Sequence, residues 1–384
     1  MKEILQFPED FIWGSATSAY QVEGGIEKND WAKFFPAGQA SDHYNQYERD
    51  FDLLKELNQG VYRFSIEWSR IEPRKGYFDR REIEHYHWVL RALRARGIKT
   101  MVTLHHFTNP EWLDWTKPAA VHYFSRFAAE IFKEYQDMVD FWVVINEPLV
   151  YALQSYLIGV WPPRKKNLWF FWKVIQNQIS AQKKVYEDFH NLRKNVRVGI
   201  AKNNVFFEPN NQKSIFDRFS VFWASYLWND YFLSKIKNHL DFIGLNYYFH
   251  SKIKFPYELK NENKEVSDLG WEIYPAGIYY VLRDLKKYKL PIYVTENGLA
   301  DAGDSRRKDF IKNHLSGIHK AIRGGADVRG YFHWSLMDNF EWDKGNEPRF
   351  GLLEIDYKTL ERKIRSSAYY YSEICQNNCL DLNR

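Results

Sequence analysis

The chain has 384 residues, of which 45% are hydrophobic and 27% are charged, and its formal net charge is +5. This composition is typical of a globular protein with an ordinary core. Because Lys and Arg are mixed with Asp and Glu along the whole sequence, we expect no nucleic-acid-binding surface. Aromatic residues reach 18%, which fits either a bulky core or a groove lined with flat rings.

Targeting and redox signals are sparse. The opening segment MKEILQFPED has no long apolar run and carries early acidic residues, so it does not resemble a secretion signal. No apolar run approaches the roughly 20 residues that span a bilayer. Cys375 and Cys379 supply too few ligands for a zinc site. We therefore expect a cytoplasmic protein with no nucleic-acid or membrane partner and no metal.

Short apolar segments alternate with amphipathic segments along the chain. Eight segments are expected to be strands: Phe11–Ser15, Gly60–Trp68, Ile98–His105, Val139–Asn146, Val196–Ala201, Leu240–Tyr247, Pro291–Thr295 and Val328–Ser335. The clearest helices between them are expected at Arg80–Arg96, Val121–Tyr135, Lys173–Leu192, Gly277–Lys287 and Arg307–Ile322. Gly97 is a plausible end for the first of these helices.

Eight such repeats without a break in composition predict a single (β/α)8 barrel over residues 1–384. The alternative is a doubly wound sheet, which normally has a glycine-rich phosphate turn after its first strand. Gly24 and Gly25 do not form that pattern. In a barrel, the reactive side chains lie at the carboxyl ends of the strands.

Polar residues follow most of the expected strands. Strand four ends in Asn146-Glu147 and strand seven in Thr295-Glu296, and these two strands lie nearly opposite each other across a barrel mouth. Paired carboxyl groups in this arrangement suit the hydrolysis of glycosidic bonds. A structural ion pair with Arg63 is the alternative interpretation. The pair His105-His106 raises a metal site as a further alternative, but such a site needs three or more ligands.

The same residues resemble those of the family 1 glycoside hydrolases, the β-glucosidase family. Seven motifs occur in the family's order: FPEDFIWGSATSAYQVEG from Phe7, YRFSI from Tyr62, LHHF from Leu104, NEP from Asn146, LNYY from Leu245, VTENG from Val294 and WSLMDNFEW from Trp334. One such motif is weak evidence, whereas seven in order over nearly the whole chain identify it as a member of the family.

The resemblance implies a retaining β-glycosidase acting by double displacement on a small-molecule β-glycoside or oligosaccharide without a cofactor. We expect β-glucosides as substrates, and β-galactosides or β-fucosides as further ones. It implies that Glu296 is the nucleophile and Glu147 the general acid/base. By the same resemblance, the residues that contact substrate are Gln21, His105, Asn146, Tyr248, Trp271, Trp334, Glu341 and Trp342, supported by Arg63 and Asn246.

Departures from the family concern the leaving-group side. His106 stands where many members have Trp, and the segments between the motifs are short. Because long βα loops build the outer subsites of such barrels, we expect an open mouth walled by Trp271 and Trp161. Two alternatives stay open: a 6-phospho-β-glycosidase, which the acidic Glu341 disfavours, and a non-catalytic sugar-binding barrel.

Overall fold

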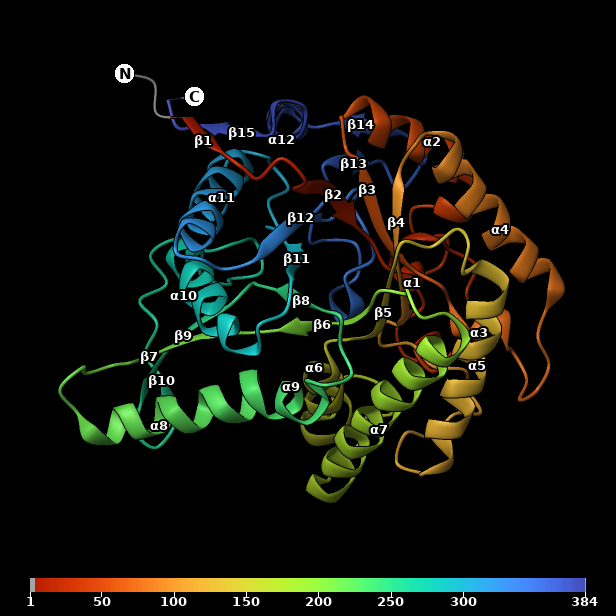
Figure 1. Cartoon of the computed structure of the whole chain (residues 1–384), viewed down its shortest axis with the longest axis horizontal. Helices are drawn as coiled ribbons and strands as arrows, with labels where there is room; N and C mark the ends of the chain where they lie inside the picture. Colours follow the sequence, from red (N-terminus) through yellow and green to blue (C-terminus); the bar gives the residue numbers. More distant parts are fainter. Residues whose placement is uncertain (1–3, 384) are drawn as a thin grey trace.

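The computed structural model describes residues 4–383, in which eight parallel strands close into a barrel (Figure 1). Each strand overlaps one of the eight predicted segments. In order around the barrel they are β2 (Ile12–Ala16), β3 (Val61–Ser65), β4 (Lys99–His105), β5 (Phe141–Asn146), β6 (Val198–Asn203), β8 (Phe242–Asn246), β11 (Ile292–Asn297) and β12 (Val328–Trp334). The predicted fold class is confirmed.

Helices surround the barrel. The five predicted helices are present, and the remainder were not predicted. The α-helices are α1 (Ala19–Val22), α2 (His43–Glu56), α3 (Trp68–Ile71), α4 (Arg80–Ala95), α5 (Ala119–Tyr135), α6 (Pro148–Ala152), α7 (Leu168–Leu192), α8 (Ile215–Ser225), α9 (Tyr231–Ile236), α10 (Pro275–Leu285), α11 (Arg307–Arg323) and α12 (Ser366–Asn377). Asp79 caps the start of α4 by accepting from the Arg81 amide. Gly97, with φ of +70°, follows its end as predicted.

The core has two parts, which the barrel wall separates. Inside the barrel, the chain packs a small cluster that includes Met101, Phe141, Val143 and Tyr293. Outside it, the strands bury Val, Ile and Leu side chains against the inner faces of the helices. Both strand faces are therefore apolar, which explains why the strand segments lack an alternating pattern.

Additional elements extend from the barrel. The short helical segments are η1 (Leu153–Ile158), η2 (Tyr226–Asp230), η3 (Lys286–Tyr288) and η4 (Trp342–Lys344). The strands outside the barrel are β1 (Ile4–Gln6), β7 (Phe206–Pro209), β9 (His250–Lys254), β10 (Glu258–Leu259), β13 (Leu353–Ile355), β14 (Arg362–Ile364) and β15 (Cys379–Asp381). Among residues 4–383, no helix combines the length and the apolarity needed to cross a membrane.

Candidate active site

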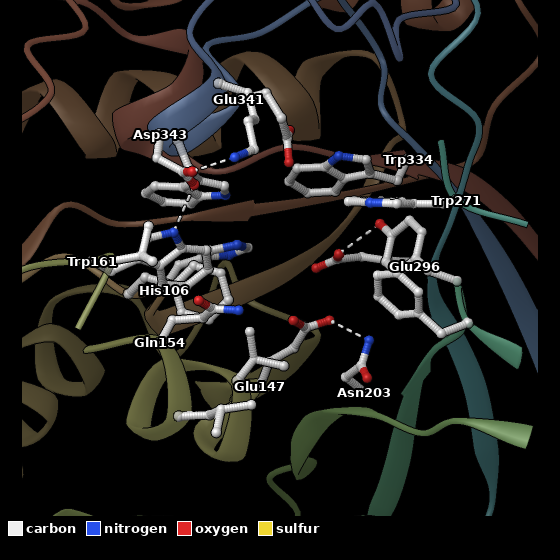
Figure 2. Close-up of a pocket in the computed structure, with 18 of the residues that line it drawn as sticks. His106, Glu147, Gln154, Trp161, Asn203, Trp271, Glu296, Trp334, Glu341 and Asp343 are labelled. Carbon is white, nitrogen blue, oxygen red and sulfur yellow. Dashed lines mark hydrogen bonds and ion pairs between the residues drawn. The ribbon is translucent and has the colours of Figure 1, made fainter. Parts of the chain in front are cut away.

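A cavity of about 380 Å³ opens at the carboxyl ends of the barrel strands (Figure 2). Seven of the predicted site residues line it: Glu147, Glu296, Tyr248, Trp271, Trp334, Glu341 and Trp342. The two predicted catalytic carboxyl groups come from β5 and β11 and both point into this space. The chain therefore brings them together as the strand-end argument expects.

Glu296 is the carboxylate with a charged partner. Its Oε1 lies 2.5 Å from an Arg63 guanidinium nitrogen, and its Oε2 accepts a hydrogen bond of 2.9 Å from the Tyr248 hydroxyl. Burial raises the pKa of Glu296 above its ordinary value, although Arg63 and Tyr248 act in the opposite direction and limit the rise. Burial also raises the pKa of Tyr248 well above its ordinary value, so this hydroxyl remains a donor. These contacts favour the ionised form of Glu296.

Glu147 lacks a cationic contact and meets only amide donors. Asn246 donates to its Oε1 at 2.8 Å and Asn203 at 3.4 Å. Burial, and then the neighbouring charge of Glu296, raise the pKa of Glu147 to about 8. Its backbone is left-handed, with φ of +43°, where β5 gives way to α6, a conformation uncommon for a residue with a long side chain. Glu147 is thus the carboxyl group that keeps its proton at neutral pH.

Three predicted residues support the carboxyl groups from behind the cavity surface. Arg63 also donates to Asn146 Oδ1 at 2.7 Å and to Thr103 Oγ1 at 3.2 Å. Asn246 donates to both Asn146 and Glu147. Because neither Arg63, Asn146 nor Asn246 lines the cavity, their contacts orient the residues that do. Asn146 was predicted to contact substrate, and the structure places it one layer deeper.

The sequence-based prediction of the sugar-binding histidine is one residue too early in the chain, because His106 and not His105 lines the cavity. His105 faces the helices, where it packs near Trp115 and Tyr151 and its Nε2 pairs with Asn109 at 3.0 Å. His106 lines the cavity instead, with its Nε2 3.2 Å from the Asn146 amide nitrogen. Burial and the Arg63 charge lower the pKa of His106 well below its ordinary value, so the ring is neutral. The cavity histidine is therefore His106.

A break in strand alternation explains this difference. Met101 packs inside the barrel, and Thr103 Oγ1 contacts the interior Arg63. Strict alternation would then turn His105 inward. Instead the next inward side chain is His106, three positions after Thr103. Neighbouring β5 behaves alike, because its register shifts between Val143 and Asn146.

Glu341 lies at the end of the cavity away from Glu147 (Figure 2), where it contacts Gln21. Gln21 donates to Glu341 Oε2 at 3.2 Å and to Asn339 Oδ1 at 2.9 Å, but it does not itself line the cavity. Burial, together with the charge of Glu296, raises the pKa of Glu341 to about 8. Trp334 also lines the cavity. Gly298 lets its own backbone pack closely against that of Trp334, since a Cβ there would lie 1.7 Å from the Trp334 carbonyl oxygen.

The remaining wall is mostly apolar. It contains Trp271, Trp161 and a set of side chains that the sequence did not single out: Phe107, Val150, Leu153, Val160, Val205, Trp228, Phe249 and Phe350. Trp161 is tied in place by a hydrogen bond of 2.8 Å to Asp343. The predicted walls of the leaving-group side, Trp271 and Trp161, both lie here. Phe107 belongs to the LHHF motif but was given no role, whereas the others lie outside the seven motifs.

Four polar residues of the cavity were also given no role from the sequence: Gln154, Asn203, Asp343 and Lys344. Asn203 ends β6 and touches Glu147, so its place after an apolar strand was the available signal. Asp343 follows the Glu341-Trp342 motif directly. As for a metal, His105 and His106 point to opposite faces of the barrel wall and do not form a chelating pair. Within residues 4–383, no three His, Cys, Asp or Glu side chains converge as metal ligands would.

Comparison with known proteins places the chain among enzymes that act on glycosides. The model of a family described as glycosyl hydrolase family 1 matches residues 4–234 and 226–380. β-Glucosidase A of Thermotoga maritima is 31% identical over 443 aligned residues, covering 98% of this chain and 99% of the relative. A 6-phospho-β-galactosidase of Staphylococcus haemolyticus is 32% identical over 471 residues, covering 97% and 99%.

A solved β-glycosidase from Pyrococcus horikoshii has the same fold. It superposes with a TM-score of 0.94 at 36% identity, covering 99% of this chain and 97% of that one. The alignments with the two sequence relatives are longer than the 384 residues of this chain. Those relatives therefore carry segments that this chain lacks, as the short spacing between motifs suggested.

Proposed function

The chain belongs to glycosyl hydrolase family 1 and is a retaining glycoside hydrolase of the β-glucosidase type; we propose that it hydrolyses β-D-glucosides through a covalent intermediate on Glu296. The observation that carries this assignment of roles is the unequal surroundings of the two carboxyl groups. Glu296 has Arg63 and Tyr248 as partners, whereas Glu147 has only amides and a pKa raised to about 8.

The unequal charge states supply a balanced sequence of steps. The ionised Glu296 attacks the anomeric carbon while Glu147 gives its proton to the glycosidic oxygen, so that an alcohol leaves. Glu147, now ionised, then takes a proton from water, which attacks the same carbon and releases Glu296. Glu296 loses its negative charge when it attacks and regains it when the intermediate is hydrolysed. Arg63, which lies 2.5 Å away, balances that charge in the free enzyme and as it returns.

The glycone would bind at the polar end of the cavity. Glu341 and His106 line that region, and Trp334 and Trp342 supply rings. A carboxyl group accepts equally from an equatorial or an axial hydroxyl, so Glu341 supports activity on β-galactosides and β-fucosides as well as β-glucosides. Gln21 holds Glu341 for this task through its hydrogen bond of 3.2 Å.

The leaving group would meet the apolar wall. Val205, Trp228 and Phe249 offer no hydrogen-bonding group comparable to those around the glycone, apart from the indole of Trp228, which is turned to Asn203 at 3.3 Å. Sugar hydroxyls would therefore lose water contacts there without replacement. We accordingly expect aryl and alkyl leaving groups to bind better than a second sugar.

A 6-phospho-β-glycosidase is the competing assignment, and one similar relative carries that name. Two carboxyl groups, Glu341 and Asp343, line the cavity. Lys344, the lysine of the cavity lining, lies 2.6 Å from Asp343 and is paired with it. A phosphate would therefore meet no unpaired Lys or Arg among the lining residues, and this disfavours its binding. A non-catalytic sugar-binding barrel is disfavoured because both carboxyl groups and their partners are in place.

A panel of nitrophenyl glycosides tests the substrate class. The β-glucoside is expected to give the largest kcat/KM, with the β-galactoside and β-fucoside next and the 6-phosphoglucoside far behind. A preference for the phosphorylated sugar would overturn the interpretation of Glu341. A 2-deoxy-2-fluoro β-glucoside with a good leaving group is expected to label Glu296, as peptide mass mapping can check. Labelling of another carboxyl group would refute its role.

A cytoplasmic location also stays a proposal, and the free thiols of Cys375 and Cys379 are compatible with it. Fractionation of the source cells followed by an activity assay tests it. Activity found mainly outside the cell would overturn it.

A further inference from the structure

Helix α8 is amphipathic, but its apolar face points away from the protein and its polar face toward it. It buries Asp217, Ser220 and Ala224 against the protein. Its apolar residues face outward, and Ile215, Phe216 and Phe222 are 76%, 67% and 62% exposed. A surface helix normally buries its apolar stripe and exposes its polar one. Something other than water is therefore expected to cover this face.

The exposed face is extended by neighbouring elements. Phe255 lies in the turn between β9 and β10, and its ring centroid is 5.4 Å from that of Phe216. Ser220 donates to the carbonyl oxygen of Pro256 at 2.9 Å, which fixes this turn on the helix. We call the combined surface the apolar ridge; its exposed members are Ile215, Phe216, Phe219, Phe222, Trp223, Tyr226, Leu227, Phe255, Tyr257 and Leu259.

The ridge lies at the periphery of the molecule, where α8 runs along the edge with the rest of the protein on one side (Figure 1). It is built around a single helix and one turn. A stable dimer needs about 800 Å² of well-fitted surface from each partner, which favours a broad face over a narrow projection. A narrow ridge rich in Phe, Trp and Tyr suits a soft medium into which side chains insert.

Charge around the ridge is basic overall, because the exposed Glu258 of β10 is paired with both Lys254 and Lys260. Asp217, the acidic residue of α8, is turned inward and accepts hydrogen bonds from the backbone amides of Asn211 and Phe255. Lys213 and Arg218 are exposed, and among residues 4–383 neither is in an ion pair with an acidic group. Exposed cations beside an aromatic face match the phosphate groups of lipids.

We propose that the apolar ridge docks on the surface of a lipid bilayer, with its aromatic side chains in the headgroup region and Lys213 and Arg218 near lipid phosphates. This docking does not require a spanning helix. It departs from the sequence-based expectation of no membrane partner, which considered only spanning segments and secretion signals. The helix lies parallel to the surface and inserts its outward face.

The ridge also connects to the active-site cavity. Val221 and Ala224 of α8 pack in one cluster with Val205, Phe249 and Trp228. The last three also line the cavity. A docked molecule would therefore hold the apolar wall of its cavity next to the lipid. This extension rests on the proposed function, and it predicts that β-glycosides with alkyl chains embedded in a bilayer are substrates.

Co-sedimentation with vesicles tests the docking. We expect the wild-type chain to bind phosphatidylcholine vesicles, and to bind more tightly when phosphatidylglycerol is included. The Phe219→Ser/Phe222→Ser double variant is expected to lose about tenfold in partitioning for each ring removed. Lys213→Gln and Arg218→Gln are each expected to lose about fivefold on the anionic vesicles alone.

Matched controls separate docking from misfolding. Trp88 on α4 is a comparably exposed aromatic residue, 53% exposed, and Trp88→Ser should leave vesicle binding unchanged. Wild-type protein that stays in the supernatant, or equal binding by wild type and the double variant, would overturn the proposal. So would a dimer in sedimentation velocity that the double variant dissolves without any vesicle binding, since a second copy would then cover the ridge.

Kinetics distinguish a failure of docking from a failure of the proposed function. The double variant should hydrolyse soluble nitrophenyl β-glucoside at the wild-type rate but an alkyl β-glucoside in vesicles more slowly. If the wild type cleaves neither, the proposed function fails while the vesicle-binding result stands. If both proteins cleave the embedded substrate equally, the ridge does not deliver substrate and the extension is wrong.

Discussion

The two walls of the cavity are built on different principles. On the polar wall, the carboxyl groups are held by side chains behind the cavity surface: Arg63 contacts Glu296 and Asn146, and Asn246 contacts Asn146 and Glu147. On the apolar wall, Val205 and Phe249 are placed by packing alone. A hydrogen-bonded network fixes geometry and charge together, whereas packed side chains mainly exclude water.

The difference predicts how each wall responds to change. Substitutions on the polar wall should have large and non-additive effects on activity, because removing one partner leaves others buried and unpaired. Substitutions on the apolar wall should be modest and should change the leaving group that is preferred. Reaction chemistry thus depends on one wall and selectivity on the other.

The largest effect is expected from removing the nucleophile. Glu296→Ala should lower kcat for aryl β-glucosides by about 10⁴-fold or more, because no covalent intermediate forms. Added azide should restore turnover and give the product of inverted configuration, which NMR can identify. A variant that keeps more than a few per cent of the activity without azide would remove Glu296 from this role.

Removing the acid/base should give a smaller loss that depends on the leaving group. Glu147→Ala should slow substrates with poor leaving groups by about a hundredfold or more, because only these need the proton. Substrates with acidic phenols as leaving groups should form the covalent intermediate at nearly the wild-type rate. Plotting log kcat/KM against the pKa of the phenol measures this, and equal losses across the series would contradict it.

The two adjacent histidines provide a matched pair on opposite sides of the barrel wall. His106→Ala should lower kcat/KM by about tenfold to a hundredfold, since a buried polar contact to the sugar is lost. His105→Ala should change kcat/KM by less than about twofold and instead destabilise the core near Trp115 and Tyr151. Kinetics and thermal melts of both variants suffice. The reverse pattern would restore His105 as the sugar ligand.

Trp271 tests the apolar wall. Its ring lies 4.8 Å from Phe249 and 5.9 Å from Tyr248 between centroids. Trp271→Ala should raise KM for aryl glucosides by an amount worth about 1 kcal/mol, that of one aromatic contact, and spare the deglycosylation rate. The wild type should also have a high KM for cellobiose. Tight binding of cello-oligosaccharides, or a variant with a lower melting temperature and unchanged selectivity, would contradict this assignment.

The smallest effect is expected from Lys202 on β6, beneath the acid/base. It is buried and donates to the Asn203 carbonyl oxygen at 2.5 Å, and burial lowers its pKa to about 7. The unfolded chain therefore binds more protons between pH 7 and the ordinary lysine pKa of about 10.4, and stability rises with pH across that window. Lys202→Met should stabilise the protein by about 1 kcal/mol at pH 6 and by progressively less toward pH 10.

The same variant affects the pH profile of activity. Activity should fall above about pH 8 as Glu147 loses its proton, in line with its raised pKa. The positive charge of Lys202 lowers the pKa of Glu147, but with a pKa of about 7 this lysine is mostly neutral near pH 8, so its removal should move the alkaline limb upward by only about 0.1 pH unit. Arg63, Glu296 and Glu341 also face this region and are unchanged. An alkaline limb that moves downward would contradict this account.

Much of the fold could be predicted because it depends on local patterns. Segments such as Ile98–His105 and Pro291–Thr295 are short, apolar and bounded by turns, and a strand covered on both faces requires such residues. Because the reactive side chains of such barrels lie at the strand ends, Glu147 and Glu296 could then be assigned to the barrel mouth from the sequence alone. The helix α8 was not predicted, because its apolar stripe faces outward and its neighbours along the chain give no sign of that.

What the sequence alone determined was which residues are present at the strand ends, and in what order. The tertiary structure decided which of them face the cavity. The step from Val143 to Asn146 coincides with a register shift between β5 and β6, and the chain makes the same three-residue step from Thr103 to His106 where β4 ends. One residue of offset thus separates the cavity histidine from a core histidine. Charge was decided in the same way, since Glu147 and Glu296 are identical side chains that differ only in what folding places beside them.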